Sequence, residues 1–235
     1  MEIRRFFADN PISGDTIVIT GDEHHHIRSV NRLKPGHRLE LIDGNGNLHH
    51  AEISYLQRNQ TVAVVKETIT QPQPPVKTII ATSILKTKAM HLLIEKLTEM
   101  GVDEIRPVNF HRTDVPFAPS MLEKWRRIAA QSLKVNKKLW ATRFHPAVSL
   151  EQLIDHSSNG NVNTRLLLDI EGPKPTTINW SPPVLAIIGP PGDYTPTEKQ
   201  LLLTNNFTPL TINPNILKTE TAALSATALI TALTE

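Results

Sequence analysis

Two different hydrophobic patterns divide the chain at a proline-rich segment. Before about residue 70, apolar and polar residues alternate in short runs, which is typical of strands. The expected strands are 5–8, 16–20, 38–42, 48–56 and 61–67, and glycine- and proline-containing turns separate them. One helical repeat, from about residue 22 to residue 33, interrupts the strands. Strands this short and closely spaced predict a small β-barrel with one helix beside it.

After the segment Gln71-Pro72-Gln73-Pro74-Pro75, strands and helices alternate. The pattern predicts strands at 78–83, 104–108, 165–170, 184–188 and 209–212, and helices at 88–100, 120–138 and 220–233. Two capping boxes, Ser149 to Gln152 and Thr195 to Glu198, open two further helices. This alternation predicts an α/β fold with a parallel sheet. Because prolines remove amide donors, we place a domain boundary between residues 70 and 71.

Composition excludes several classes of protein. The chain is 39% hydrophobic and 20% charged, and no apolar run reaches the length of a membrane span, so we expect no membrane association. The first residues include an acid and lack the apolar core of a secretory signal, which predicts a cytoplasmic protein. The absence of cysteine excludes disulfides, thiolate metal sites and cysteine nucleophiles. A net charge of only +2 means that any nucleic-acid surface must be local.

Two loops carry the candidate chemistry. In open parallel sheets, ligands bind beyond the carboxyl ends of the strands. Residues 187–193 run from an apolar strand into two glycines and two prolines, although such a turn is also compatible with a tight connection that binds nothing. Residues 215–223 place Lys218, hydroxyl groups and Glu220 at a helix start, where free amides hold acceptor atoms. The alternative for this segment is a well-capped surface helix.

These two loops carry a resemblance. The segments IIGPPGDYTPTE (187–198) and ILKTETAALSA (216–226) resemble the signature loops of SPOUT methyltransferases. Within that superfamily the chain resembles the ribosomal RNA small-subunit methyltransferase E family, which modifies uridine at N3. RRFF (4–7), DEHHHIRSVNRLKPG (22–36) and IDGNG (42–46) are similar to its RNA-binding barrel, and LIEKLTEMGVDEIRPVNFHRT (93–113) is similar to the opening of its catalytic domain.

The resemblance implies a PUA-like RNA-binding β-barrel at 1–70 and a trefoil-knotted SPOUT domain at 71–235. It implies S-adenosylmethionine as the cofactor, 16S ribosomal RNA of the small subunit as the substrate, and a homodimer as the active unit. Backbone groups of the loops 167–170, 188–193 and 212–217 would hold the cofactor. The cofactor-binding residues that it implies are Leu168, Ile188, Gly189, Pro190, Gly192, Ile212, Asn215, Ile216, Leu217, Thr219, Thr221 and Ala222.

Methylation of uridine N3 determines which catalytic residues we expect. N3 must lose its proton, and the base must leave any stack before a methyl group can approach. A cation beside the uracil carbonyl oxygens stabilises the anion that forms. Arg112, after a strand end, and Lys218 are the candidates, with a solvated surface side chain as the alternative for Arg112. Glu220 is a candidate proton acceptor or partner of Lys218, although the helix dipole alone also favours a carboxylate there.

Basic residues of the N-terminal part predict RNA contacts. The candidates are Arg4, Arg5, His25, Arg28, Arg32 and Lys34, with a polar helix face as the alternative for those between 22 and 34. We expect no metal at His24-His25-His26, because neighbouring residues on a helix point about 100° apart and do not converge on one ion. The helix 120–138 offers a second basic surface.

The chain departs from the family pattern at a few positions. The family usually has Gly-Pro-Glu-Gly-Gly where this chain has Gly189-Pro190-Pro191-Gly192-Asp193, and it commonly has arginine where this chain has Lys218. In the long helix, Gln131-Ser132 match but the family's following arginine is absent. Two alternatives to an active methyltransferase are therefore a degenerate RNA-binding relative and an unrelated nucleotide-binding enzyme. The second lacks support, because neither G-x-G-x-x-G nor G-x-x-x-x-G-K-[ST] occurs.

Overall fold

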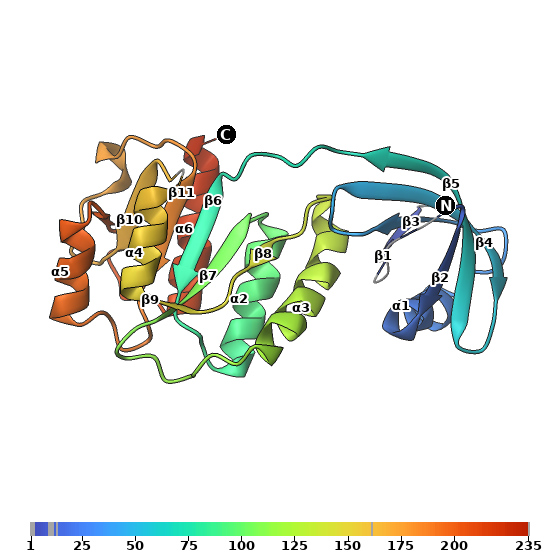
Figure 1. Ribbon diagram of the computed structural model, residues 1–235, viewed down its shortest axis with the longest axis horizontal. Helices are drawn as coiled ribbons and strands as arrows, with labels where there is room; N and C mark the ends of the chain where they lie inside the picture. Colours follow the sequence, from blue (N-terminus) through green and yellow to red (C-terminus); the bar gives the residue numbers. More distant parts are fainter. Residues whose placement is uncertain (1–2, 9–11, 13, 161, 235) are drawn as a thin grey trace. The chain divides into compact units, whose positions relative to one another are not determined.

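The computed structural model describes residues 3–8, 12, 14–160 and 162–234 (Figure 1). The chain folds into two compact units. The N-terminal unit contains residues up to Pro74 together with Leu133–Ala141, and the C-terminal unit contains Pro75–Ser132 and the residues from Thr142 onward. The proline-rich segment 71–75 therefore lies where the chain first passes from one unit to the other.

The N-terminal unit is a five-stranded curled sheet of order β1-β3-β4-β5-β2. The strands are β1 (Arg4–Phe7), β2 (Thr16–Thr20), β3 (Arg38–Ile42), β4 (Asn47–Leu56) and β5 (Gln60–Thr70). β1 pairs with β3 in parallel, and the other pairs are antiparallel. In β2, Ile17 and Ile19 are buried whereas Val18 is 44% exposed, the alternation expected of a strand with one face on a core. The predicted strands are confirmed.

The helix of this unit is shorter than the sequence pattern predicts. α1 (Gly21–His25) continues as a π-helix, η1 (His26–Val30), and does not reach Leu33. The backbone N–H and the side-chain amide of Asn31 both donate to the carbonyl of His26, at 2.8 and 3.0 Å. Arg32 follows with a φ of 51°, a left-handed conformation that ends the helix.

The C-terminal unit is built on a parallel sheet of order β12-β10-β11-β6-β7-β8. Its strands are β6 (Thr78–Thr82), β7 (Glu104–Asn109), β8 (Arg143–Phe144), β9 (Val148–Ser149), β10 (Thr164–Leu168), β11 (Val184–Ile188) and β12 (Thr208–Leu210), with β9 pairing to β7. β6 and β11 are buried along their whole length, as expected of central parallel strands. The predicted parallel sheet is confirmed.

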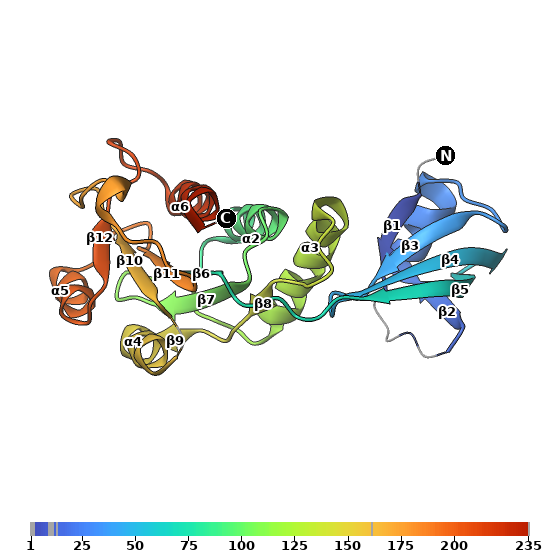
Figure 2. The same cartoon turned by 90° about the horizontal axis from the view of Figure 1, so that it is seen from above.

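Helices cover both faces of this sheet. They are α2 (Thr87–Glu99), α3 (Ser120–Asn136), α4 (Leu150–Asn159), α5 (Pro196–Thr204) and α6 (Thr219–Thr234), with a short 3-10 helix η2 (Pro175–Thr177). Figure 2 shows α2 and α6 on one face and α4 on the other. α3 ends two residues before the predicted Lys138, because Lys137 has a φ of 61°.

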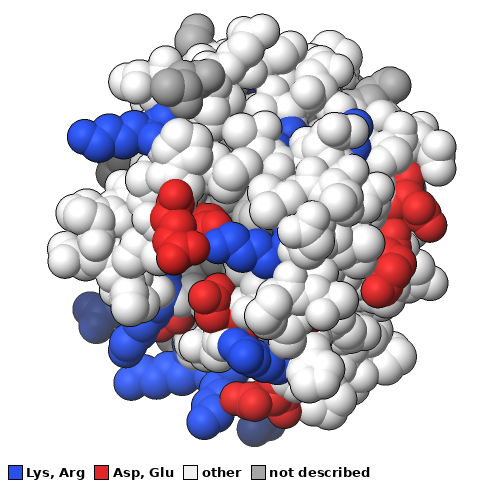
Figure 3. All heavy atoms as spheres, turned by 90° about the vertical axis from the view of Figure 1, so that its left-hand side faces the viewer, with Lys and Arg blue, Asp and Glu red and all other residues white. Residues whose placement is uncertain are grey.

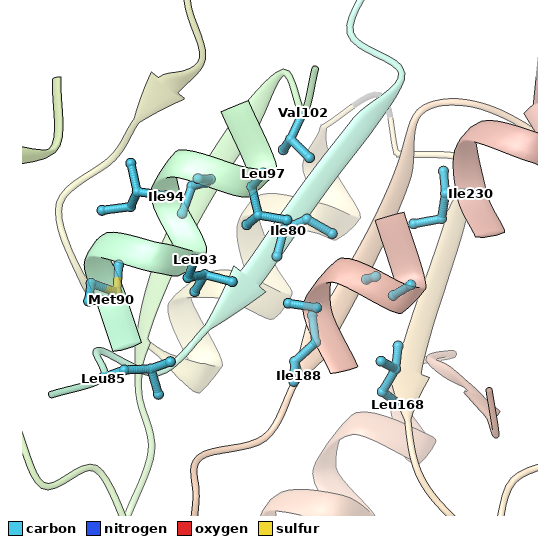
Figure 4. Close-up of a cluster of buried hydrophobic side chains, with 14 of the residues drawn as sticks. Ile80, Leu85, Met90, Leu93, Ile94, Leu97, Val102, Leu168, Ile188 and Ile230 are labelled. Carbon is cyan, nitrogen blue, oxygen red and sulfur yellow. The ribbon is translucent and has the colours of Figure 1, made fainter. Parts of the chain in front are cut away.

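Two apolar clusters hold these layers together, one on each face. In the first, Ile80 of β6 and Leu93 of α2 are fully buried, and Ile230 of α6 is 1% exposed (Figure 4). Full burial of each such side chain stabilises the fold by about 1.5–3 kcal/mol. The sheet is thereby a rigid base for the loops that leave its carboxyl ends.

Candidate functional site

The loops that follow β10, β11 and β12 start side by side, because these three strands are neighbours in the parallel sheet. Leu168 pairs with Leu210, and Leu167 pairs with Ile187, so the three strands end at the same level. The loop after β10 lies against the end of β12: Asp169 N–H donates to the carbonyl of Leu210 (3.0 Å), and Thr211 N–H donates to that of Pro173 (2.9 Å). The loop after β10 and the residues after β12 are two of the segments that the resemblance assigns to the cofactor.

The loop 189–194 forms a tight turn in spite of its departure from the family sequence. Asp193 N–H donates to the carbonyl of Pro190 (2.9 Å), and Asp193 has a φ of 63°. Aspartate tolerates this left-handed conformation better than most residues, because its short side chain hydrogen-bonds locally. Asp193 Oδ1 accepts from Tyr194 N–H at 2.8 Å. Asp193 therefore maintains a backbone conformation in which the family's glycine is the usual residue.

Arg112 is bound to this loop. Its Nη1 donates to the carbonyl of Gly192 (2.5 Å) and lies 3.5 Å from that of Tyr194. A Cβ atom on Gly192 would lie 3.3 Å from Arg112 Cδ, so glycine allows the close approach. The guanidinium has five N–H donors, and no described residue accepts from Nε or Nη2. Arg112 is thus oriented by the loop while keeping donors for a ligand.

The start of α6 contacts the other end of the same loop. Thr219 is buried, and its Oγ1 donates to the carbonyl of Gly189 at 3.1 Å. Within the described part of the chain, the N–H groups of Ile216 and Leu217 have no hydrogen-bond acceptor. Lys218 is exposed, Glu220 is half-buried, and no ion pair joins these two described residues. The loop 189–194 is therefore contacted both by Arg112 and by the start of α6.

The remaining candidate cofactor residues form an apolar base with a polar rim. Leu168 and Ile188 are buried beside α6 and belong to one apolar cluster, against which Ile212 and Ala222 pack (Figure 4). Asn215 and Thr221 are exposed, and the side chain of Ile216 is 87% exposed. The structure thus gathers the predicted residues around three adjacent strand ends.

Sequence reasoning missed the first turn of α5. Glu198 Oε2 accepts from Thr195 N–H (2.8 Å), which closes the predicted capping box, but Oε1 accepts from His111 N–H (2.7 Å), 87 residues away. Burial raises the pKa of Glu198, but these donors lower it overall. Lys199 Nζ lies 2.7 Å from Asp169 Oδ2 and 2.9 Å from Glu171 Oε2. The capping box was visible in the sequence. Nothing in the sequence indicated that this turn also contacts His111, Asp169 and Glu171.

The predicted RNA-binding residues fall into two groups in the N-terminal unit. Arg5 is paired with Glu40 at 2.8 Å, and Arg28 donates to the carbonyls of Gln57 and Arg58, both at 3.0 Å. Arg5 and Arg28 therefore also hold the fold together. The other four are Arg4, His25, Arg32 and Lys34, which are exposed, as Arg28 is.

The side chains of the histidine run 24–26 do not come together at one metal position. His24 is buried with its Nδ1 2.8 Å from Thr61 Oγ1, whereas His25 is exposed. Among residues 3–8, 12, 14–160 and 162–234, no group of three or more acidic or histidine side chains is arranged to hold a metal ion. No helix in those ranges has the length and apolar character needed to cross a membrane.

Comparison with known proteins assigns the chain to a family. A family model described as an RNA methyltransferase domain matches residues 72–231, and one described as an RNA methyltransferase PUA domain matches residues 19–66. The chain belongs to this family of RNA methyltransferases. The ribosomal RNA small subunit methyltransferase E of Synechocystis is 24% identical over 240 residues, covering 100% of this chain and 79% of the relative. That of Bacillus subtilis is 26% identical, covering 94% and 91%.

A solved structure supports the same assignment. The ribosomal RNA small subunit methyltransferase E of Neisseria gonorrhoeae, bound to S-adenosyl methionine, is 26% identical to this RNA methyltransferase. It superposes with a TM-score of 0.87 over 99% of this chain and 98% of its own. The expected fold class, a PUA-like sheet followed by a SPOUT domain with a parallel sheet, is confirmed.

Proposed function

We propose that this RNA methyltransferase transfers a methyl group from S-adenosylmethionine to N3 of a uridine in 16S ribosomal RNA. Relatives named ribosomal RNA small subunit methyltransferase E align along nearly the whole chain, which supports the substrate class. The geometry that carries the proposal is the loop 189–194, since Thr219 contacts its Gly189 end and the oriented cation of Arg112 contacts its Gly192 end. Such a loop joins a cofactor site to a substrate site.

The residues present fit the cofactor. Leu168 and Ile188 offer buried apolar surface at adjacent strand ends, and the N–H groups of Ile216 and Leu217, which have no acceptor among the described residues, offer donors beside it. An adenine ring with an amino-acid tail needs this combination of an apolar surface and a few oriented polar groups. S-adenosylmethionine supplies an electrophilic methyl group on its sulfonium sulfur. The remaining cofactor candidates in our proposal are Gly189, Pro190, Gly192, Ile212, Asn215, Thr219, Thr221 and Ala222.

We assign Arg112 and Lys218 to charge stabilisation at the uracil ring. Loss of the N3 proton leaves negative charge on the carbonyl oxygens, and fixed cations beside them stabilise that charge. Arg112 is pre-oriented by its bond to Gly192, so little reorganisation is needed when the base arrives. Lys218 is exposed at the start of α6, and Glu220 in the first turn is the proposed proton acceptor.

The charge distribution supports RNA as the substrate. Lys and Arg side chains gather over the lower part of the face in Figure 3, the side toward which β6 points in Figure 1. Exposed cations that follow the carboxyl ends of strands are Lys86, Lys88, Arg112 and Lys218. Phosphate contacts of this kind position RNA without reading its sequence. We propose residues 1–70 as the RNA-binding domain and 71–235 as the catalytic domain. The further RNA contacts in this proposal are Arg4, Arg5, His25, Arg28, Arg32 and Lys34.

We also propose that the protein acts as a homodimer. Ile216 and Ile170 lie on two of the loops that border the cofactor site, and their side chains are 87% and 48% exposed. Contiguous exposed apolar surface marks interaction sites, whereas single exposed apolar side chains are common, so the proposal rests chiefly on the resemblance to SPOUT methyltransferases, in which two chains form the active unit. Light scattering of the purified protein tests this: a mass of two chains agrees with the proposal, and a mass of one chain contradicts it.

Calorimetric titration with S-adenosylmethionine tests the proposed function against a degenerate relative. We expect saturable binding by the natural chain, because Asp193 preserves the turn. The double variant Pro191→Glu with Asp193→Gly rebuilds the family's loop and serves as the comparison. Similar affinity in both proteins agrees with an active enzyme. Binding only by the double variant would instead identify the natural chain as degenerate.

A further inference from the structure

We propose that the first turn of α5 acts as a brace, in which Glu198 and Lys199 are positioning residues for two different loops of the site. Glu198 holds the loop that carries Arg112, and Lys199 holds the loop after β10. The inference rests on the proposed function and adds residues to it. Neither side chain needs to touch the cofactor or the RNA.

Glu198 joins the loop after β7 to the N-terminus of α5 through one carboxylate. Oε1 accepts from His111 N–H at 2.7 Å, and Oε2 accepts from Thr195 N–H and Oγ1 at 2.8 and 2.9 Å. His111 directly precedes Arg112, whose guanidinium donates to the carbonyl of Gly192. The backbone on both sides of the Arg112 contact is therefore fixed by Glu198. Hydrogen bonds to an ionised acceptor are about twice as strong as neutral ones.

Lys199 fixes the loop on the cofactor side. Its Nζ lies 2.7 Å from Asp169, whose side chain is 11% exposed, and 2.9 Å from Glu171, whose side chain is 79% exposed. The Asp169 contact is the stronger of the two, because water screens an exposed pair. Asp169 follows Leu168 directly and donates its N–H to the carbonyl of Leu210. Lys199 thereby holds the end of β10 against the end of β12.

The helix geometry allows one turn to serve both loops. Adjacent residues on an α-helix point about 100° apart, so Glu198 and Lys199 reach in different directions. The turn itself is fixed by the capping box of Thr195, by Pro196 at its first position, and by Leu202, which is fully buried. A displacement of α5 would therefore move the Arg112 loop and the cofactor loop together.

Four variants test the brace in the full-length protein. Glu198→Gln keeps the shape but places an amide N–H₂ where one acceptor oxygen was, and Lys199→Met removes the charge. Lys199→Arg restores the charge, and Gln200→Ala changes an exposed neighbour on the same helix. We expect Glu198→Gln to lower kcat for RNA methylation about tenfold with an unchanged Kd for S-adenosylmethionine. We expect Lys199→Met to raise that Kd about tenfold, Lys199→Arg to restore it, and Gln200→Ala to match the natural chain.

Hydrogen exchange gives a readout that does not depend on activity. Glu198→Gln should accelerate exchange of the His111 amide, and Lys199→Met should accelerate exchange of the Asp169 amide, each without affecting the other. Unchanged exchange and kinetics in both variants would overturn the brace, and so would a Lys199→Arg protein as impaired as Lys199→Met. If the natural chain neither binds S-adenosylmethionine nor methylates RNA, the proposed function fails, and the exchange pattern alone decides whether the brace exists.

Discussion

The crossing of the β10 loop with the end of β12 gives the strongest structural prediction. A Cβ atom on Gly172 would lie 2.6 Å from Leu210 N and 2.9 Å from Leu210 C and Cα. These are backbone atoms with no freedom to rotate away, so Gly172→Ala must separate the two segments. The hydrogen bonds from Asp169 to Leu210 and from Thr211 to Pro173 lie directly beside the contact.

We expect Gly172→Ala to lower the free energy of unfolding by about 3 kcal/mol. Overpacking a filled space costs about 1–3 kcal/mol, and each weakened backbone hydrogen bond costs about 1 kcal/mol. Urea denaturation measures the stability, and calorimetry measures the affinity for S-adenosylmethionine, which should fall because the two loops that we propose as cofactor-binding segments separate. Gly36→Ala is the control, since it has a left-handed φ of 86° but no atom within 4 Å. Gly36→Ala should cost about 1 kcal/mol and leave cofactor affinity unchanged. A Gly172→Ala protein with natural stability and affinity would refute the reasoning.

The remaining predictions concern one turn and two buried carboxylates. Asp193→Ala should destabilise the protein by about 1–2 kcal/mol in urea denaturation, because alanine tolerates a φ of 63° poorly and cannot accept from Tyr194 N–H. Lys134→Met should cost about 3 kcal/mol in the same assay, because it removes the cation that lies 2.6 Å from the carboxylate of Glu23, a side chain that is 3% exposed and also accepts from Phe7 N–H. Burial raises the pKa of Glu104, but His145, Arg106 and Arg143 lower it overall from 4.5 to about 2. Its ion pairs therefore stabilise the fold above about pH 4.5, by on the order of 3 kcal/mol, and this contribution is lost as the pH falls toward 2.

Matched variants separate these specific losses of stability from nonspecific destabilisation of the fold. Asp193→Gly should retain the natural stability to within about 1 kcal/mol, because glycine adopts the same φ freely. Glu104→Gln should flatten the dependence of stability on pH between about 5 and 2. Equal losses in Asp193→Gly and Asp193→Ala, or an unchanged pH profile in Glu104→Gln, would contradict the physical reasons given. A Lys134→Met protein of natural stability would show that the ion pair is replaced at no cost.

The strands and most helices were predictable because burial imposes a period on the sequence. Ile17 and Ile19 alternate with exposed residues in β2, and the wholly apolar β11 indicates a central parallel strand. β8 and β9 have two residues each and are too short to carry a period. The change to a π-helix at His26 depends on how Asn31 bonds to one carbonyl, which periodicity does not encode.

The loops of the candidate site were visible in the sequence, but the hydrogen bonds between them were not. The glycines and prolines of 189–193 and the hydroxyls at the start of α6 were visible as a loop and a helix start. The sequence did not show that Arg112 is bonded to Gly192, or that Glu198 reaches His111, because these pairs are 80 and 87 residues apart. Nor did it show that Asp193 occupies a left-handed conformation, with a φ of 63°, at the position where the family loop usually has glycine.

The most direct test of the proposed activity is nucleoside analysis of a methyl-transfer reaction. Purified protein is incubated with S-adenosylmethionine and with small ribosomal subunits that lack N3-methyluridine, and the RNA is then digested and separated by mass spectrometry. We predict that N3-methyluridine appears in proportion to enzyme turnover, and that Arg112→Ala lowers its rate by at least about tenfold. Methylation at any other atom of the nucleoside, or cofactor binding without a methylated product, would contradict the proposal.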